Sequence, residues 1–255
     1  MPFLVDLHVH TREASPCASQ SVEELLARAE QVGLGGVAGT DHNKIIGAQK
    51  AQRCARRRPI KVFMGIEVLT EEIGDVLVYG LRHEFPDAPV SLRHLTRMVE
   101  KEKAVMFAAH PFRRHTHNAL WGYLEDEGIS WKHSLRLPEI LWPLAGVEVY
   151  NGGCTPQEND EAVAFATRFR LRGIAGSDAH GIWRVGWSAT EFPHAMKSDE
   201  QLVEALREGK FKVSRGQTEF ESDKERKQHL KAMAELKGQE LVTYVENWIR
   251  RKSPK

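Results

Sequence analysis

The fold is decided by the stretch Phe3-Leu4-Val5-Asp6-Leu7-His8-Val9-His10. Its apolar residues are typical of a buried strand, and it ends in two histidines separated by one valine. Because residues i and i+2 of a strand point to the same face, His8 and His10 can both face one centre. The stretch therefore predicts a first strand that carries two imidazoles to a functional site.

Short apolar runs alternate with amphipathic stretches along the rest of the chain, which is the pattern of βα units. Further strands are predicted over residues 36–40, 60–68, 75–81, 104–109, 146–150, 173–177 and 211–214. Helices are predicted over residues 21–31, 46–57, 92–103, 158–170 and 200–208. Ser21 is expected to cap the first helix, and Gly33 follows its end. The pattern indicates an α/β fold whose main domain covers residues 1–218.

The last part of the chain, residues 219–255, is rich in Lys, Glu, Arg and Gln and predicts a charged C-terminal helical tail. An apolar stripe could run along it through Leu230, Met233, Leu236, Leu241, Val245 and Trp248. We favour packing of this stripe on the main domain over binding of a partner.

The composition excludes some classes of function. The chain has 255 residues, of which 41% are hydrophobic and 28% charged, as in an ordinary globular protein. A net charge of +1 provides no overall field for non-specific nucleic-acid binding. Without a signal peptide, a membrane-length apolar run or a C-x-x-C pair, the sequence favours a cytoplasmic protein that does not enter membranes. It does not indicate an oligomeric state.

Polar residues that can bind metals follow the predicted strands. Asp41-His42 ends the second strand, Glu67 lies near the end of the third, and His110 follows Ala109. Asp178-Ala179-His180 repeats the i, i+2 spacing after another strand. In a barrel the carboxyl ends of parallel strands line one mouth, so these segments can converge. A single strand-end histidine is usually scaffolding, but the joint pattern favours a functional site.

The chemistry of this set indicates a catalytic metal centre. Neutral imidazoles and carboxylates suit Zn, Mn or Fe, and the absence of a thiolate set argues against a closed structural zinc site. The predicted ligands outnumber those of one tetrahedral ion, so two or three divalent ions are expected. The ligands are His8, His10, His42, Glu67, His110, Asp178 and His180.

A family resemblance rests on these same motifs. They are Asp6-Leu7-His8-Val9-His10-Thr11, Thr40-Asp41-His42-Asn43, Gly65-Ile66-Glu67-Val68, Ala109-His110-Pro111-Phe112 and Gly176-Ser177-Asp178-Ala179-His180. In this order they resemble the motifs of the PHP (polymerase and histidinol phosphatase) family. The resemblance runs from about residue 4 to about residue 216. It implies a distorted (β/α)7 TIM-like barrel, a centre of two or three metal ions and phosphoester hydrolysis.

The resemblance also assigns the ligands to ions. His8, His10, Glu67 and Asp178 would hold one ion. His42 and His180 would hold a second, and Glu67 with His110 would begin a third.

Two positions depart from the family pattern. Many members have a His or Asp shortly after the first motif, where this chain offers only Glu13 and Cys17, and we favour a structural role for both. No strand-end histidine completes the third ion site, so Asp75 or Glu148 is the candidate there. Either could instead support the ligands from outside, as we expect of Asp6 and Asp41.

Residues near His110 and His180 could contact the substrate. Arg113 and Arg114 are candidates for clamping a phosphoryl group, and Arg184 is a further anion-binding candidate. His117, with His115 beside it, is a candidate proton donor to the leaving oxygen. Exposed loop positions without a catalytic role are the alternative for each of them.

The favoured function is a metal-dependent phosphoesterase that hydrolyses a small phosphomonoester or a nucleotide. The near-neutral charge weakly favours this substrate class over the alternative of a nuclease that trims short nucleic acids. A non-catalytic metal-binding regulatory module and a hydrolase of C–N bonds are the rivals from other classes.

Overall fold

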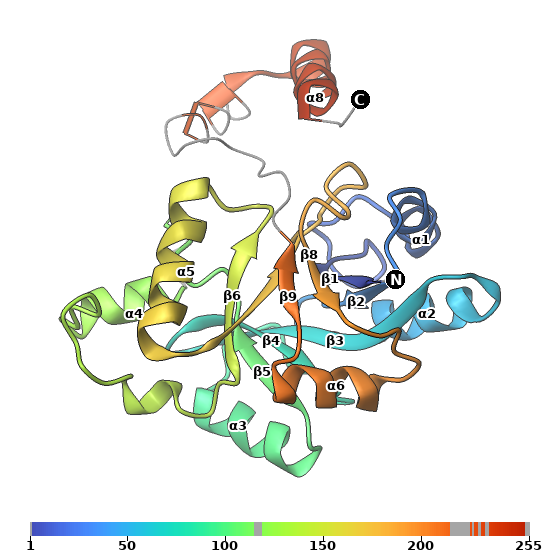
Figure 1. The fold of residues 1–255 in the computed structure, drawn as a ribbon. Helices are drawn as coiled ribbons and strands as arrows, with labels where there is room; N and C mark the ends of the chain where they lie inside the picture. Colours follow the sequence, from blue (N-terminus) through green and yellow to red (C-terminus); the bar gives the residue numbers. More distant parts are fainter. Residues whose placement is uncertain are drawn as a thin grey trace.

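The structure, a computed structural model, describes residues 2–114, 119–214, 225, 227–228, 231–232 and 235–252. The strands are β1 (Phe3–Val9), β2 (Gly36–Gly39), β3 (Lys61–Thr70), β4 (Gly74–Tyr79), β5 (Val105–Ala108), β6 (Gly146–Asn151), β7 (Arg172–Gly176), β8 (Ala189–Phe192) and β9 (Lys212–Ser214). The α-helices are α1 (Val22–Gln31), α2 (Ile46–Cys54), α3 (Leu92–Lys101), α4 (Leu120–Asp126), α5 (Pro156–Phe169), α6 (Asp199–Glu208) and α8 (Gly238–Lys252) (Figure 1). Two short 3-10 helices are η1 (Ala55–Arg57) and η2 (Glu139–Leu141).

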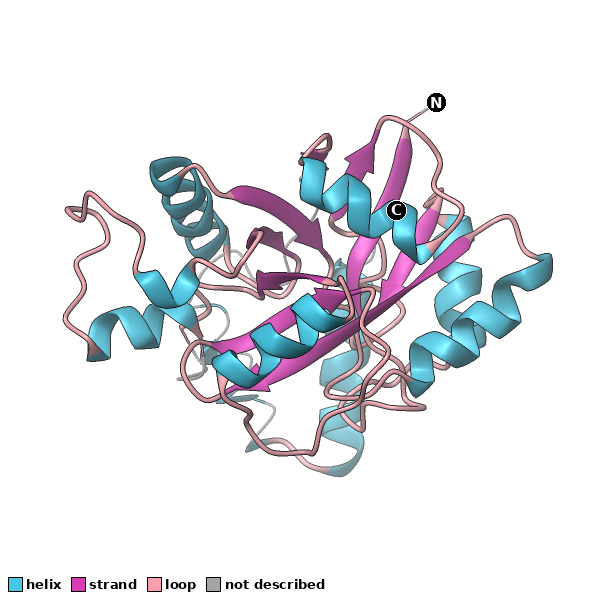
Figure 2. Cartoon of the chain, turned by 90° about the horizontal axis from the view of Figure 1, so that it is seen from below, coloured by secondary structure: helices cyan, strands magenta, loops and turns pink. Residues whose placement is uncertain are grey.

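The strands form a single sheet in the order β7-β6-β5-β4-β3-β2-β1-β8-β9. Strand β4 is antiparallel to both of its neighbours, and so is β8, whereas the other pairs are parallel. Thus β4 and β8 run against all the other strands of the sheet. Seen from below, the helices surround the strongly twisted sheet (Figure 2).

The sheet curls until its seventh strand meets its first. Just after β7, Asp178 N donates to His8 O (2.8 Å), and His10 N donates to Ala179 O (3.1 Å). Gly176 makes this approach possible, because a Cβ atom there would lie 2.6 Å from the backbone nitrogen of His8. The result is the expected distorted TIM-like barrel, with two reversed strands that the sequence pattern did not reveal.

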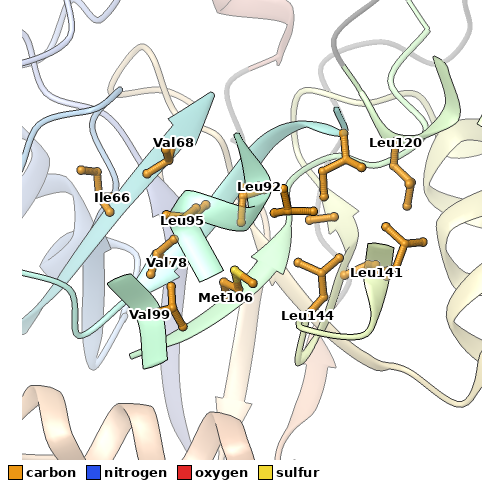
Figure 3. Close-up of a cluster of buried hydrophobic side chains, with 14 of the residues drawn as sticks. Ile66, Val68, Val78, Leu92, Leu95, Val99, Met106, Leu120, Leu141 and Leu144 are labelled. Carbon is orange, nitrogen blue, oxygen red and sulfur yellow. The ribbon is translucent and has the colours of Figure 1, made fainter. Parts of the chain in front are cut away.

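Helices cover the outside of the barrel through apolar faces. Leu92, Leu95 and Val99 on α3 pack against strand residues that include Ile66 and Val78 (Figure 3). A second cluster, including Val5, Leu7, Phe63 and Phe107, is formed mainly by strand side chains. These rigid layers fix the strand ends from which the candidate site is built.

Local signals set the helix ends as predicted. Ser21 caps α1, and its side chain and that of Glu24 form a reciprocal capping box. Thr155 and Glu158 repeat this arrangement on α5, whose first residue is Pro156. The predicted elements of the barrel are confirmed to within a few residues, but β8 and α4 were not anticipated.

The division into a main domain of residues 1–218 and an extension of residues 219–255 stays a prediction. Helix α8 lies in the proposed extension, but most of the predicted apolar stripe falls outside the described side chains. No helix in the described part of the chain combines the length and apolar character needed to cross a membrane.

Candidate metal centre

Five segments far apart in the sequence meet at one mouth of the barrel. They bring together the seven predicted ligands and also Asp75: His8, His10, His42, Glu67, Asp75, His110, Asp178 and His180. Potential ligand atoms form four overlapping groups, within each of which all atoms lie within 4.8 Å of one another. The groups are His10–His42–His180, His8–His110–Asp178, His8–His10–Glu67 and Glu67–Asp75–His110.

The two histidines of β1 form the deepest part of the centre. His8 Nε2 and His10 Nε2 lie 3.1 Å apart, and both side chains are fully buried. Glu67 carboxylate oxygens lie 3.3 and 3.4 Å from these two nitrogens. Asp178 Oδ1 lies 3.5 Å from His8 Nε2 and 3.3 Å from His10 Nε2. Ring nitrogens that converge between two buried carboxylates are suited to a divalent cation.

Glu67 links three parts of the centre. Its Oε1 lies 3.0 Å from His110 Nε2, and its Oε2 lies 3.0 Å from His42 Nδ1. Burial alone would raise the pKa of this carboxyl, but the charges of His8 and His42 hold the pKa of Glu67 well below its usual range. Glu67 is therefore an anionic bridge between neighbouring candidate ion sites.

A more open group lies on the solvent side. The His10 ring centre is 4.2 Å from that of His180 and 4.5 Å from that of His42. The His42 side chain is 40% exposed and that of His180 is 27% exposed. An ion held here would be reachable by a substrate, unlike one held only by His8 and His10.

Asp75, one of the two candidates for the third ion site, lies in a third group with Glu67 and His110. Its Oδ2 lies 3.7 Å from His110 Nε2, and Glu67 shares the same imidazole. Burial and the nearby charge of Glu67 raise the pKa of Asp75 to about 6. A cation would favour the ionised form of both carboxyls and relieve their repulsion.

Glu148, the other candidate for this position, supports the ligands from behind. It accepts from the His110 backbone N–H (2.8 Å), and its Oε1 lies 3.1 Å from His8 Nδ1. A carboxylate on the second ring nitrogen leaves His8 Nε2 free to bind a metal.

Asp6 and Asp41, which we expect to support the ligands from outside, accept hydrogen bonds from the segments beside them. Asp6 accepts from the backbone nitrogens of His8, Ser177 and Gly186. Asp41 accepts from Thr11 N and Ser15 Oγ.

Two arginines meet beside Asp178. Arg113 Nη2 donates to Asp178 Oδ2 and to Asn151 Oδ1, and Arg184 Nη1 donates to the Asp178 carbonyl (2.8 Å). A Cβ atom at Gly153 would lie 2.8 Å from Arg113 Nη2 and 3.2 Å from Arg184 Nη1. Both guanidinium groups thus lie over Gly153 at the edge of the centre.

The remaining predicted catalytic residues are placed differently. The Arg114 side chain contacts Glu161 on α5, and the structure does not bring it to the ligand groups. His117 and His115 lie outside the described residues.

Glu13 and Cys17 both lie in the loop after β1, but they make different contacts. Glu13 accepts from Val22 N at the start of α1 and pairs with Lys50 (2.7 Å), which confirms a structural contact. Cys17 instead lies beside His180 and His42. Burial would raise the pKa of the Cys17 thiol, but those two histidines outweigh it and lower the pKa to about 6.

Asn151 is not among the residues predicted from the sequence, although the sequence carries a signal for it. It ends β6, and its side chain connects Arg113, Glu148 and Gly153 N. A polar residue at the carboxyl end of a strand is the same signal that identified the histidines.

Comparisons with known proteins agree with this geometry. A family model described as "PHP-associated" matches residues 156–211, which run from the start of α5 to the residue before β9 and include Asp178 and His180. The matched residues make up less than a quarter of the chain.

Two proteins from other organisms share parts of the sequence. The error-prone DNA polymerase of Pseudomonas aeruginosa is 26% identical over 190 residues, which cover 71% of this chain and 18% of the polymerase. The chain therefore corresponds to a small part of that relative. An uncharacterized protein of Methanocaldococcus jannaschii is 28% identical over 194 residues, covering 74% of this chain and 70% of that protein.

Solved structures share the fold. A two-domain protein from Bacteroides vulgatus, described as containing a predicted PHP-like metal-dependent phosphoesterase, superposes with a TM-score of 0.64. It is 18% identical, and the match covers 85% of this chain and 65% of that one. Endonuclease Q, in complex with a 27-mer duplex carrying an abasic lesion, gives a TM-score of 0.59 at 16% identity, covering 84% of this chain and 58% of the endonuclease chain.

Proposed function

We propose that this chain is a PHP-type, metal-dependent hydrolase of phosphoesters. The observation that carries the proposal is the overlap of the four ligand groups, in which Glu67, His8, His10 and His110 each belong to two groups. Shared ligands place candidate ions next to one another, as in enzymes that act on phosphoryl groups with more than one metal.

The residues present fit divalent ions. Glu67 Oε2 is buried and accepts no hydrogen bond from the described residues. His10 Nε2 and His42 Nδ1 nevertheless lie 3.4 and 3.0 Å from it, so this oxygen is placed to bind a cation. His8, His10, Glu67 and Asp178 would hold one ion, His42 and His180 a second, and Glu67, Asp75 and His110 a third. Such ions supply Lewis-acid chemistry, namely activation of water and neutralisation of phosphoryl charge.

The chain itself would orient the substrate. Arg113 is held by Asp178 and Asn151, so its planar guanidinium has a fixed direction beside the ligands. A fixed cation next to a phosphoryl group stabilises the charge that develops there during displacement. Arg184 supplies a second cation at the same edge. His117, which lies outside the described residues, stays the proposed proton donor.

The test is a phosphoester panel measured on protein loaded with Zn, Mn or Fe. We expect phosphate release from a nucleoside monophosphate or another small monoester. Replacing Arg113 with Ala should lower kcat/KM by about 10²–10³ while metal content is retained. The control is Arg168→Ala, because the Arg168 guanidinium donates to the Ser134 carbonyl and lies over the Phe169 ring. Turnover of an amide substrate that is insensitive to Arg113→Ala would favour a C–N hydrolase.

A nuclease is the second candidate, and the similarity to endonuclease Q favours it. The same panel should therefore include a short single strand and a duplex with an abasic lesion. Cleavage of these in preference to the monoester would select the nuclease. Intact metal content without turnover on any substrate would instead favour a non-catalytic metal-binding module.

A further inference from the structure

Gln20, in the loop between β1 and α1, is a buried polar side chain at the seam, where the segment after β7 meets the end of β1. Its Nε2 donates to the carbonyl of His10 (2.7 Å) and to the carbonyl of Ala179 (2.6 Å). A side-chain amide nitrogen carries two hydrogens, so one nitrogen can serve both acceptors. Since both partners are carbonyl oxygens, they also determine which end of the amide faces them. Gln20 therefore uses both of its donors to join two backbone segments.

These two segments carry candidate ligands from opposite sides of the seam. His10 directly follows β1, and Ala179 stands between Asp178 and His180. His10 N also donates to Ala179 O (3.1 Å), so the Ala179 carbonyl accepts from both His10 and Gln20. The Gln20 amide thus lies across the seam at the level of the ligands.

The backbone around Gln20 is itself fastened. Gln20 O accepts from Arg12 N (2.9 Å), and Ser19 N donates to His180 O (2.8 Å). The next residue, Ser21, caps α1. The Gln20 side chain therefore projects from a backbone that is fixed by the helix on one side and by the His180 segment on the other.

We propose that Gln20 is a positioning residue that sets the distance across the seam between His10 and the pair formed by Asp178 and His180. The proposal rests on the metal centre of the proposed function and adds to it a residue outside the ligand groups. Gln20 acts through the backbone carbonyls of His10 and Ala179, as do other residues that orient metal ligands from outside.

The position of the seam determines which ions depend on Gln20. Two of the proposed ions have ligands on both sides of the seam: the ion of His8, His10, Glu67 and Asp178, and the ion next to His10, His42 and His180. The ion of Glu67, Asp75 and His110 has ligands from β3, β4 and the residue two positions after β5, none of which adjoins the seam. Loss of the Gln20 donors should weaken the first two ions and spare the third, whereas general loosening of the fold would weaken all three.

The test is Gln20→Met, which removes both donors and keeps the length of the side chain. The metal-free full-length protein is titrated with Zn²⁺ against a chelating indicator. We expect the affinity for the ions across the seam to fall by about 10–100-fold while the third is unchanged. Asp75→Asn, which removes a ligand of the third ion alone, identifies its binding event. Circular dichroism checks folding, and Gln20→Asn, whose amide is too short to reach both carbonyls, gives the same comparison if Gln20→Met does not fold.

Thr190→Val is the matched control. Thr190 Oγ1 accepts from Ala175 N (2.9 Å) and donates to Ala175 O (3.1 Å), so it also makes two buried bonds to the backbone, on β7 and ahead of the ligands. This variant should keep all zinc affinities even where its stability falls. Unchanged zinc binding in Gln20→Met, or an equal loss for every ion, would overturn the role of Gln20 and leave the metal centre intact. An unaltered protein that binds no zinc would overturn the metal centre together with this role.

Discussion

Asp178 is the residue at which metal binding, substrate orientation and backbone geometry meet. One of its oxygens faces His8 and His10, and the other accepts from Arg113. Its φ angle of 52° lies in the left-handed region, which Asn and Asp tolerate better than most residues. The position therefore combines a ligand with a backbone shape that few side chains accept.

Asp178→Asn should leave a folded protein that has lost metal and activity. Asparagine accepts the same φ angle but lacks the negative charge that attracts the ions and Arg113. Metal per chain by elemental analysis and phosphoester turnover are the measurements, with folding checked by circular dichroism. Asp126→Asn at the exposed end of α4 is the control. Full metal content in Asp178→Asn would refute this assignment.

At this scale the sequence located the ligands because each stands at or near a strand end. It left Asp75 and Glu148 as alternative ligands for the third ion. Spacing along the chain does not show which carboxylate faces His110 Nε2 and which faces His8 Nδ1. The pairing of Arg114 with Glu161 also escaped it, because that contact depends on how α5 packs.

The elements of the barrel position the loops around the centre, and α1 is the clearest case. Glu13 accepts from Val22 N at the helix start and pairs with Lys50 on α2. These contacts lower the pKa of Glu13 from 4.5, against the effect of burial. The stabilisation is therefore present above pH 4.5 and is lost as the pH falls through the lower pKa of the folded state.

Glu13→Gln should accordingly destabilise the protein by about 1 kcal/mol at about pH 7. At a pH below the folded-state pKa, where both states carry a protonated Glu13, the variant and the unaltered protein should differ little. Urea unfolding at the two pH values measures the difference. An equal loss at both values would mean that the ionised carboxylate is not what stabilises the helix start.

The approach of β7 to β1 depends on Gly176. Its missing side chain leaves room for the His8 backbone, so Gly176→Ala must push the two strands apart. We expect a loss of about 1–3 kcal/mol and weaker metal binding, because His8 and Asp178 lie on the displaced strands. Chemical unfolding and a metal titration are the readouts. A variant as stable as the unaltered protein would show that the barrel does not close through this contact.

Sequence patterns found most elements because capping residues and apolar periodicity are local. Strand β8 was not predicted, because it has only four residues and is defined by its pairing with β1 and β9 rather than by a local sequence pattern. The reversed direction of β4 is likewise set by its pairing with β3 and β5.

For the whole molecule, the metal centre should couple to stability. Its ligands come from segments throughout the barrel, so ions that bind the folded state alone stabilise all of it. A free ion concentration of about 100 times Kd would add about 2.7 kcal/mol. For a chain of this length the Tm should rise by about 5–10 °C. Scanning calorimetry with metal and with a chelator measures this shift, and an unchanged Tm would contradict the coupling.

The barrel was predictable from the order of the motifs, while its closure was not, because closure depends on contacts between the two ends of the sheet. The extent of the C-terminal extension and a cytoplasmic location stay predictions. A partner for the tail is likewise untested.

The central claim is that separated strand ends together bind a cluster of ions. An anomalous difference map from crystals of the zinc-loaded protein tests it most directly. We predict at least two peaks, about 3.5–4 Å apart, in contact with Glu67 and the surrounding imidazoles. Peaks elsewhere on the protein, with none between His8, His10 and Asp178, would contradict it.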